Sequence, residues 1–158
     1  MSKSGPTVFT PIEPPPPDLE IRRAHWSEDE SAIAAIRRAV FIEEQNVPEA
    51  MEWEDIDPAC DWFVARHGDA QVATARLTPQ GRIGRMAVLP DWRGRGIGSA
   101  LLDLVLARAA ERGLDRVELH AQCHALGFYR RFGFEAVGPE FDEAGIPHRR
   151  MILNLAKD

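Results

Sequence analysis

The segment from Arg82 to Glu111 constrains the fold more strongly than any other part of the chain. A β-rich run, Arg82 to Leu89, precedes a glycine-rich loop, and a helix from about Gly98 to Glu111 follows it. Leucine or valine stands at nearly every position from 101 to 106, which leaves the helix only a narrow polar strip. A strand that leads through a short loop into a buried helix is typical of a sheet with helices packed on its faces.

The loop itself, Arg93-Gly94-Arg95-Gly96-Ile97-Gly98, predicts an anion-binding site. Glycines allow the backbone to approach a ligand closely, and the free N–H groups at a helix N-terminus attract anionic oxygens. Arg93 and Arg95 add charge-assisted donors. The spacing is not that of a dinucleotide fingerprint, and no Gly-Lys-Ser/Thr ending of a P-loop follows. We therefore expect a diphosphate of another kind, with a plain structural turn as the alternative.

The remainder of the chain divides into a tail and one domain. Residues 1–18 are rich in proline and predict a disordered tail, so the domain should span 19–158. A first strand is expected at Leu19 to His25, followed by a helix that ends near Gln45. Ser27 and Glu30 form a predicted capping box at the start of this helix. The run from Asn46 to Pro58 has the composition of a loop.

Later segments alternate between strand and helix patterns. Two β-rich runs flank a turn sequence, which indicates a hairpin. The predicted elements are strands at Trp62–Arg66, Gln71–Leu77 and Arg116–Ala121, a short helix at Ala125–Phe132, and closing strands at Phe134–Val137 and Arg149–Leu155. This order predicts an α/β (α+β) fold with a mixed sheet flanked by helices.

Composition excludes several functions. The chain has 158 residues and a formal net charge of -6, so general binding to nucleic acid is not expected. No apolar run approaches the roughly 20 residues that cross a bilayer, and we predict no membrane association. The two cysteines, Cys60 and Cys123, are far apart, which fits a reducing compartment. We expect a cytoplasmic protein.

Two motifs in this order resemble the GCN5-related N-acetyltransferase (GNAT) superfamily. The loop Arg93 to Gly98 is similar to its Arg/Gln-x-x-Gly-x-Gly/Ala signature, and Phe128-Tyr129 to Gly133-Phe134 is similar to its Phe-Tyr-x-x-x-Gly-Phe segment. Val40 to Pro48 and Gly145 to His148 resemble a group of small bacterial members. The resemblance implies a mostly antiparallel central sheet and acetyl-CoA as co-substrate, and makes a homodimer possible.

The resemblance also implies which residues bind the cofactor. Backbone groups of Met86 to Val88 would hold the pantetheine arm of acetyl-CoA, and those of Gly94 to Ser99 would hold its pyrophosphate. Gln122 stands where many members carry an asparagine that touches the cofactor. The implied cofactor-binding residues are Met86, Ala87, Val88, Arg93, Gly94, Arg95, Gly96, Ile97, Gly98, Ser99, Gln122 and Tyr129.

Acetyl transfer to an amine requires a proton acceptor, an oxyanion donor and an acid for the leaving thiolate. Tyr129, the single tyrosine, occupies the position of that acid in many members, although it could instead be a packed aromatic residue. The backbone N–H of Val88 is the expected oxyanion donor. For the base, the sequence leaves Glu44, Glu118, His120 and His148 open.

Two further questions are whether the chain binds a metal ion and which kind of amine accepts the acetyl group. The stretch His120 to His124 contains zinc-ligand types, but it lacks a second matching pair, and we predict no metal. The acidic run Glu49 to Asp57 could attract a cationic amine, or could be a solvated loop. We predict an N-acetyltransferase for a small-molecule or peptide amine. A non-catalytic acetyl-CoA-binding module is the alternative.

Overall fold

A computed structural model of the chain describes residues 17–156. The predicted proline-rich tail therefore lies almost entirely outside the described residues, and its conformation stays a prediction.

The domain is built on one seven-stranded sheet with the strand order β1-β2-β3-β4-β5-β7-β6. Neighbouring strands run antiparallel except for the parallel pair of β4 and β5. The strands are β1 (Leu19–Arg23), β2 (Asp61–His67), β3 (Ala70–Leu77), β4 (Arg82–Val88), β5 (Arg116–Gln122), β6 (Glu135–Glu143) and β7 (Ile146–Asn154). The predicted mixed, mostly antiparallel sheet is confirmed.

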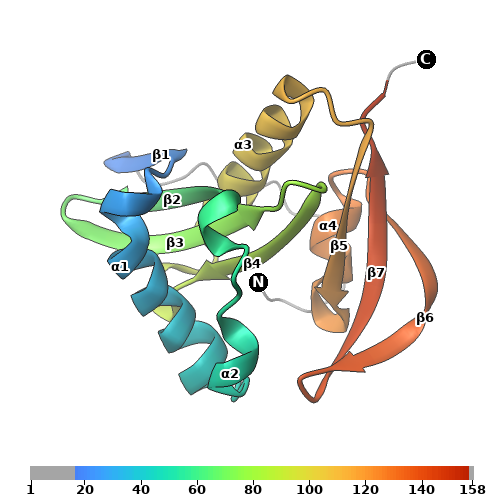
Figure 1. The fold of residues 1–158 in the computed structure, drawn as a ribbon, viewed down its shortest axis with the longest axis horizontal. Helices are drawn as coiled ribbons and strands as arrows, with labels where there is room; N and C mark the ends of the chain where they lie inside the picture. The colour runs from blue at the N-terminus through green and yellow to red at the C-terminus, as the bar shows by residue number, and fades with distance from the viewer. Residues whose placement is uncertain (1–16, 157–158) are drawn as a thin grey trace.

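Helices cover both faces of the sheet (Figure 1). Alternate residues of β2 show the two layers: Phe63 and Ala65 join the core that contains α3, whereas Trp62 and Val64 pack with Ile33 of α1. Such alternation follows from the two-residue period of a strand. The helices are α1 (Trp26–Arg37), α2 (Glu49–Glu52), α3 (Ile97–Glu111) and α4 (Leu126–Arg130), with a π-helix η1 (Arg38–Glu44) and 3₁₀ turns η2 (Asp57–Ala59), η3 (Pro90–Trp92) and η4 (Cys123–Ala125).

The start of α1 differs from the predicted capping box. The helix begins at Trp26, so Ser27 lies inside its first turn and caps nothing. The Asp29 carboxylate instead accepts a hydrogen bond of 2.8 Å from the His25 backbone N–H. Trp26 stacks on Trp62 with ring centroids 5.3 Å apart, and this contact accounts for the earlier start.

The parallel pair β4 and β5 is joined over only two residues. Arg82 pairs with Glu118 and Ile83 with Leu119, after which the strands diverge (Figure 1). On its other edge, β4 contains a bulge opposite β3, where Arg85 has a φ of 48°. A bulge bends and twists its strand. The bend opens a space between β4 and β5 toward their carboxyl ends.

Two segments are more ordered than predicted. The closing strands extend to form a long hairpin of β6 and β7, because residues 141–143 and 146–148, between the two predicted strands, continue the pairing. The run from Asn46 to Pro58, predicted as a loop, contains α2 and begins η2. Both segments border the space between β4 and β5.

Candidate functional site

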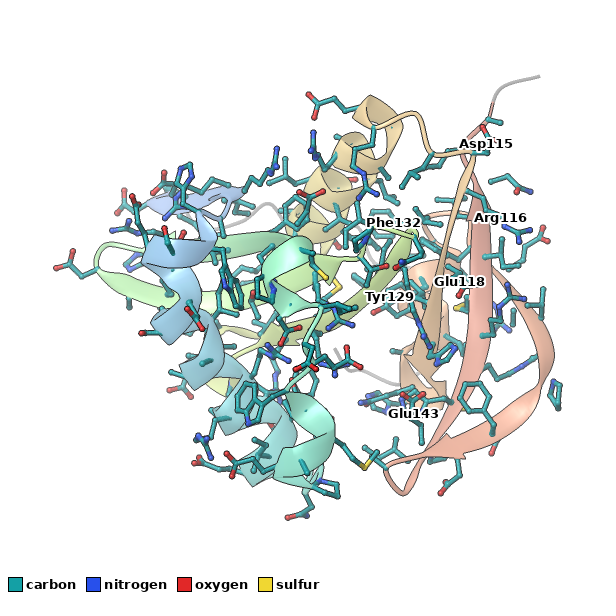
Figure 2. The ribbon with its side chains drawn as sticks, viewed as in Figure 1. Asp115, Arg116, Glu118, Tyr129, Phe132 and Glu143 are labelled. Atoms are coloured by element: carbon teal, nitrogen blue, oxygen red, sulfur yellow. The ribbon has the colours of Figure 1, made fainter. Side chains whose placement is uncertain are left out.

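A cavity of about 2320 Å³ occupies the space between the diverging strands. Side chains from α4, β5 and the β6–β7 hairpin surround it, and Figure 2 labels Glu118, Tyr129 and Glu143 among them. All implied cofactor residues except Arg95 line this cavity, together with Glu44, Glu118, His120 and His148. The guanidinium of Arg95 lies over the Trp92 ring, 4.9 Å from its centroid. The predicted site residues, apart from Arg95, are thus brought together.

The glycine loop presents free backbone donors at the start of α3. Gly94 and Gly96 have φ values of 75° and 79°, a region that favours glycine. In the described part of the chain, no N–H group from Gly94 to Ser99 donates to a backbone carbonyl. A β-carbon at Gly94 would meet no atom within 4 Å, so the loop is open to a ligand. Free N–H groups at a helix N-terminus suit a diphosphate.

Beyond Ile83, the cavity-facing edge of β4 has no strand partner among the described residues. The Leu89 N–H donates to the Val72 carbonyl at 2.9 Å, so Val88 occupies the neighbouring non-hydrogen-bonded position of the antiparallel pair. The Val88 N–H and carbonyl therefore point away from β3. The carbonyl accepts a 2.8 Å bond from Arg93 Nε. The Val88 N–H remains oriented toward the space where β5 has diverged.

Tyr129 lies on α4 with its ring against aromatic neighbours. The Phe128 and Phe134 rings contact it edge-on, with centroids 5.0 and 5.8 Å away. Its hydroxyl is 3.7 Å from the Met86 sulfur on β4. Although the ring keeps some solvent contact through the cavity, desolvation by the surrounding protein raises the pKa of Tyr129 to about 12. The phenol is therefore protonated at neutral pH.

Glu44, at the end of η1, is held by Arg93. The two groups form a bidentate pair with distances of 2.8 and 2.7 Å. The hydrogen bonds from Arg93 lower the pKa of Glu44. Because Arg93 also binds the Val88 carbonyl, this pair connects η1 to the carboxyl end of β4.

Glu118 and His120 lie on the face of β5 opposite the main core. Arg150 on β7 binds Glu118 with distances of 2.9 and 2.6 Å, and these hydrogen bonds lower the pKa of Glu118. The His120 Nδ1 lies 3.0 Å from Glu143 Oε1, and the Arg82 guanidinium contacts the same ring. The face shared by Glu118 and His120, predicted from strand alternation, is thus confirmed.

His148, the fourth candidate base, is largely buried on β7. Its Nδ1 lies 2.7 Å from the Ile146 carbonyl, which accepts a hydrogen bond from this nitrogen and so places the proton there. The ring stacks on Phe141 at 6.0 Å between centroids. Gln122, opposite His148 in the sheet, binds the Gln45 side chain at 3.0 Å.

Sequence reasoning missed a buried network of charges beneath the cavity. Arg37 on α1 is only 1% exposed and binds Glu52 at 2.7 Å and Asp57 at 3.0 Å. Arg76 on β3 binds Asp57 at 2.9 Å, and Arg85 binds Glu52 at 3.1 Å. These arginines bind Glu52 and Asp57, so these two carboxylates of the acidic run are not free to attract a cationic amine. The sequence signal for this network was Arg37, a charged residue inside the predicted amphipathic helix.

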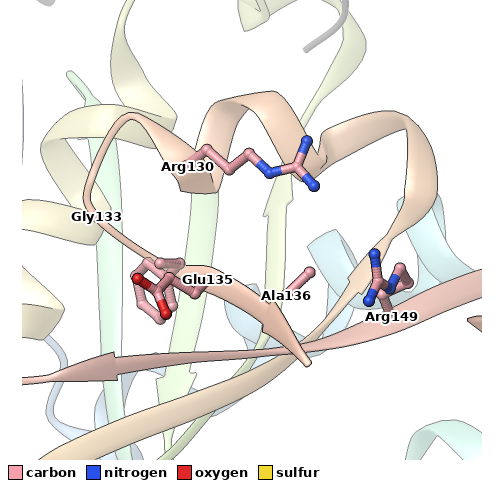
Figure 3. Close-up of a pocket in the computed structure, with 6 residues that line it drawn as sticks. Arg130, Gly133, Glu135, Ala136 and Arg149 are labelled. Atoms are coloured by element: carbon pink, nitrogen blue, oxygen red, sulfur yellow. The ribbon is translucent and has the colours of Figure 1, made fainter. Parts of the chain in front are cut away.

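A second, shallow pocket of about 570 Å³ lies beside α4 and β6 (Figure 3). Arg130 and Arg149 project toward it, but none of the candidate catalytic residues lines it. Within residues 17–156, no group of three or more metal-ligand side chains occurs, and no helix there is long and apolar enough to span a membrane. The candidate catalytic residues line the larger cavity.

A sheet that forks beside a glycine loop, with free donors at the helix start, defines an acyl-CoA-dependent transferase. The family profile of the acetyltransferase (GNAT) domain matches residues 24–155, and the chain belongs to this family. It is an N-acetyltransferase, and acetyl-CoA is its co-substrate, as for other enzymes of this fold.

Two relatives illustrate the family match, and a third protein shares the fold. The uncharacterized N-acetyltransferase YjcF of Bacillus subtilis is 31% identical, over 74% of this chain and 86% of the relative. The crystal structure of Escherichia coli ElaA has a TM-score of 0.73 and 32% identity, covering 84% of this chain and 98% of that one. A GNAT family acetyltransferase from Elizabethkingia anophelis with acetyl-CoA bound has a TM-score of 0.65 at 14% identity, covering 89% and 100%.

Proposed function

We propose that this enzyme transfers an acetyl group directly from acetyl-CoA to the amine of a small molecule or peptide in the cavity between β4 and β5. The observation that carries the proposal is the set of free backbone N–H groups from Gly94 to Ser99 beside the unpaired edge of β4. The glycine loop would bind the pyrophosphate, and Met86 to Val88 would bind the pantetheine arm. Acetyl-CoA supplies an activated thioester.

The chain's own groups provide the other requirements of acyl transfer. The amine nitrogen attacks the thioester carbon, the carbon–sulfur bond breaks, the amine loses a proton and the thiolate gains one. The Val88 N–H would donate to the developing oxyanion. Tyr129 would protonate the thiolate, because its phenol is protonated and its hydroxyl lies 3.7 Å from the Met86 sulfur on β4, where the pantetheine arm would bind.

We propose His120 as the base. Arginines bind the carboxylates of Glu44 and Glu118 and lower their proton affinity, so both are weak bases at neutral pH. The His148 ring donates from Nδ1 and keeps Nε2 as an acceptor, but it is largely buried and stacked on Phe141, so it is less accessible to the amine than His120. His120 lies on the cavity wall, and Glu143 Oε1 lies 3.0 Å from its Nδ1, which orients the ring.

Kinetics of two variants test these roles. Tyr129→Phe keeps the aromatic contacts and removes only the hydroxyl, and His120→Gln removes the proton acceptor. We expect each to lower kcat for acetyl-CoA-dependent thiol release by about 10²-fold or more. His25→Gln, an exposed histidine away from the cavity, is the control. Unchanged kcat in both variants would refute the assigned roles.

Measurements of acetyl-CoA binding and of thiol release together distinguish an enzyme from a non-catalytic acetyl-CoA-binding module. Acetyl-CoA at about 100 times its Kd should stabilise the protein by about 2.7 kcal/mol in thermal unfolding. Such stabilisation without thiol release for any amine would indicate a binding module. Absence of stabilisation would refute the cofactor site. The possible homodimer stays a prediction, which light scattering can test.

A further inference from the structure

Arg82 differs from the other sheet arginines that line the cavity. In the described part of the chain, Arg76 and Arg85 each have carboxylate partners within 4 Å, whereas Arg82 has none. Its side-chain contact is with the ring nitrogens of His120. An arginine is an unusual neighbour for an imidazole, because a guanidinium has only donors and bears a positive charge.

The cavity's carboxylates are already occupied. Each one in the described residues that lines the cavity has a cationic or imidazole partner, so the wall offers no free carboxylate to bind an ammonium group. The pairs are Glu44 with Arg93, Glu52 with Arg37 and Arg85, Glu54 with Arg76, Glu118 with Arg150, and Glu143 with His120. Among the sheet arginines that line the cavity, Arg82 is therefore the one without a carboxylate within 4 Å in the described residues.

The position of Arg82 places its positive charge beside the proposed reaction centre. Arg82 begins β4 and pairs with Glu118, one register before the last pair, Ile83 with Leu119, after which β4 and β5 diverge. Its guanidinium and the His120 ring share the cavity-facing side of this junction. A group bound by Arg82 and an amine that transfers its proton to His120 must consequently be only a few covalent bonds apart.

We infer that Arg82 binds a carboxylate of the acceptor, and that the acceptor is an amine with a nearby carboxylate, as in an α-amino acid. This inference rests on the proposed function. A planar guanidinium binds a carboxylate with two parallel hydrogen bonds. The same contact draws Arg82 away from His120, which frees a ring nitrogen to accept the amine proton. An acceptor without the carboxylate leaves the guanidinium in contact with the ring nitrogens of His120, so they are not free to accept the amine proton.

Matched acceptors test the inference. Thiol release is measured with acetyl-CoA and the proteinogenic α-amino acids, each compared with its α-carboxamide. For the wild type, we expect kcat/KM for at least one amino acid to exceed that of its carboxamide by about 10- to 100-fold, the usual effect of one charge-assisted hydrogen bond. Arg82→Gln should reduce this ratio to near one, and Arg82→Lys should retain part of it.

Arg116→Gln provides the control, because Arg116 lies on β5 outside the cavity and should leave the ratio unchanged (Figure 2). The inference is overturned if no amino acid is preferred over its carboxamide, or if Arg82→Gln lowers both rates equally. In that event, acetyl-CoA stabilisation and thiol release with other amines would still support the proposed function. Loss of those two signals would refute the proposed function itself.

Discussion

The Asp29 carboxylate binds donors from three parts of the fold. Arg22 on β1 contacts it at 3.0 and 3.1 Å, the His25 N–H at 2.8 Å and Gln71 on β3 at 3.1 Å. The hydrogen bonds from Arg22 are the main reason that the pKa of Asp29 falls to about 2. One buried side chain thus connects the first strand, the first helix and the central sheet.

Asp29→Asn should lower the free energy of unfolding by about 2 kcal/mol at pH 7. The folded-state pKa is depressed, so this stabilisation is fully present above the unfolded value near 4 and is lost as pH falls toward about 2. Urea denaturation at pH 7 and pH 3 should show the difference from the wild type shrinking at the lower pH. Glu28→Gln, in the same turn but exposed, is the control. A difference independent of pH would contradict the linkage.

At the scale of elements, the glycine loop and α3 act as one unit. Gly96 precedes the helix with a φ of 79°, and Gly113 follows it with a φ of 75°. Both glycines have the left-handed conformation, but only Gly96 lines the cavity. A comparison of the same substitution at Gly96 and at Gly113 therefore separates the effect of backbone strain on stability from the effect on acetyl-CoA binding.

Gly96→Ala and Gly113→Ala should each destabilise the protein by about 1 kcal/mol, because alanine strains the left-handed region. Gly96→Ala should also reduce the stabilisation by acetyl-CoA, whereas Gly113→Ala should leave it intact. Thermal unfolding with and without acetyl-CoA measures both quantities. Equal acetyl-CoA stabilisation of the two variants would show that the loop does not bind the cofactor.

At the scale of the whole molecule, the charge network around Arg37 joins α1, α2 and β3. Removing one member leaves buried charges without a partner, which costs more than the net contribution of the intact network. Arg37 also lies 4.7 and 4.9 Å from the ring centroids of Trp53 and Trp62. The network holds the segment of α2 against the sheet beside the cavity.

Arg37→Met should therefore lower the free energy of unfolding by about 3 to 5 kcal/mol. Its sequence neighbour Arg38 is the control, because it pairs with Glu49 at 2.7 Å with both side chains about half exposed. Arg38→Met should cost less than about 1 kcal/mol. Chemical denaturation measures both. Similar losses in the two variants would mean that the buried network contributes little.

Local pattern was sufficient for much of this architecture. The hairpin of β2 and β3, the strand β4, the glycine loop and α3 follow from alternation, turn residues and helical periodicity, because each depends on neighbours in sequence. The same reasoning misplaced the cap of α1, since stacking of Trp26 on Trp62 moved the helix start. It also missed α2, whose position depends on Arg37, Arg76 and Arg85.

The sequence by itself determined the fold class, the family motifs and the candidates for catalysis, because these reside in contiguous segments. Only the tertiary structure decided which candidates carry arginine partners, and that Arg82, unlike Arg76 and Arg85, has no carboxylate within 4 Å in the described residues. The partners of Glu44 and Glu118 are 49 and 32 residues away along the chain. Electrostatic environment depends on distance in space, and no local pattern encodes the separation between Arg82 and His120.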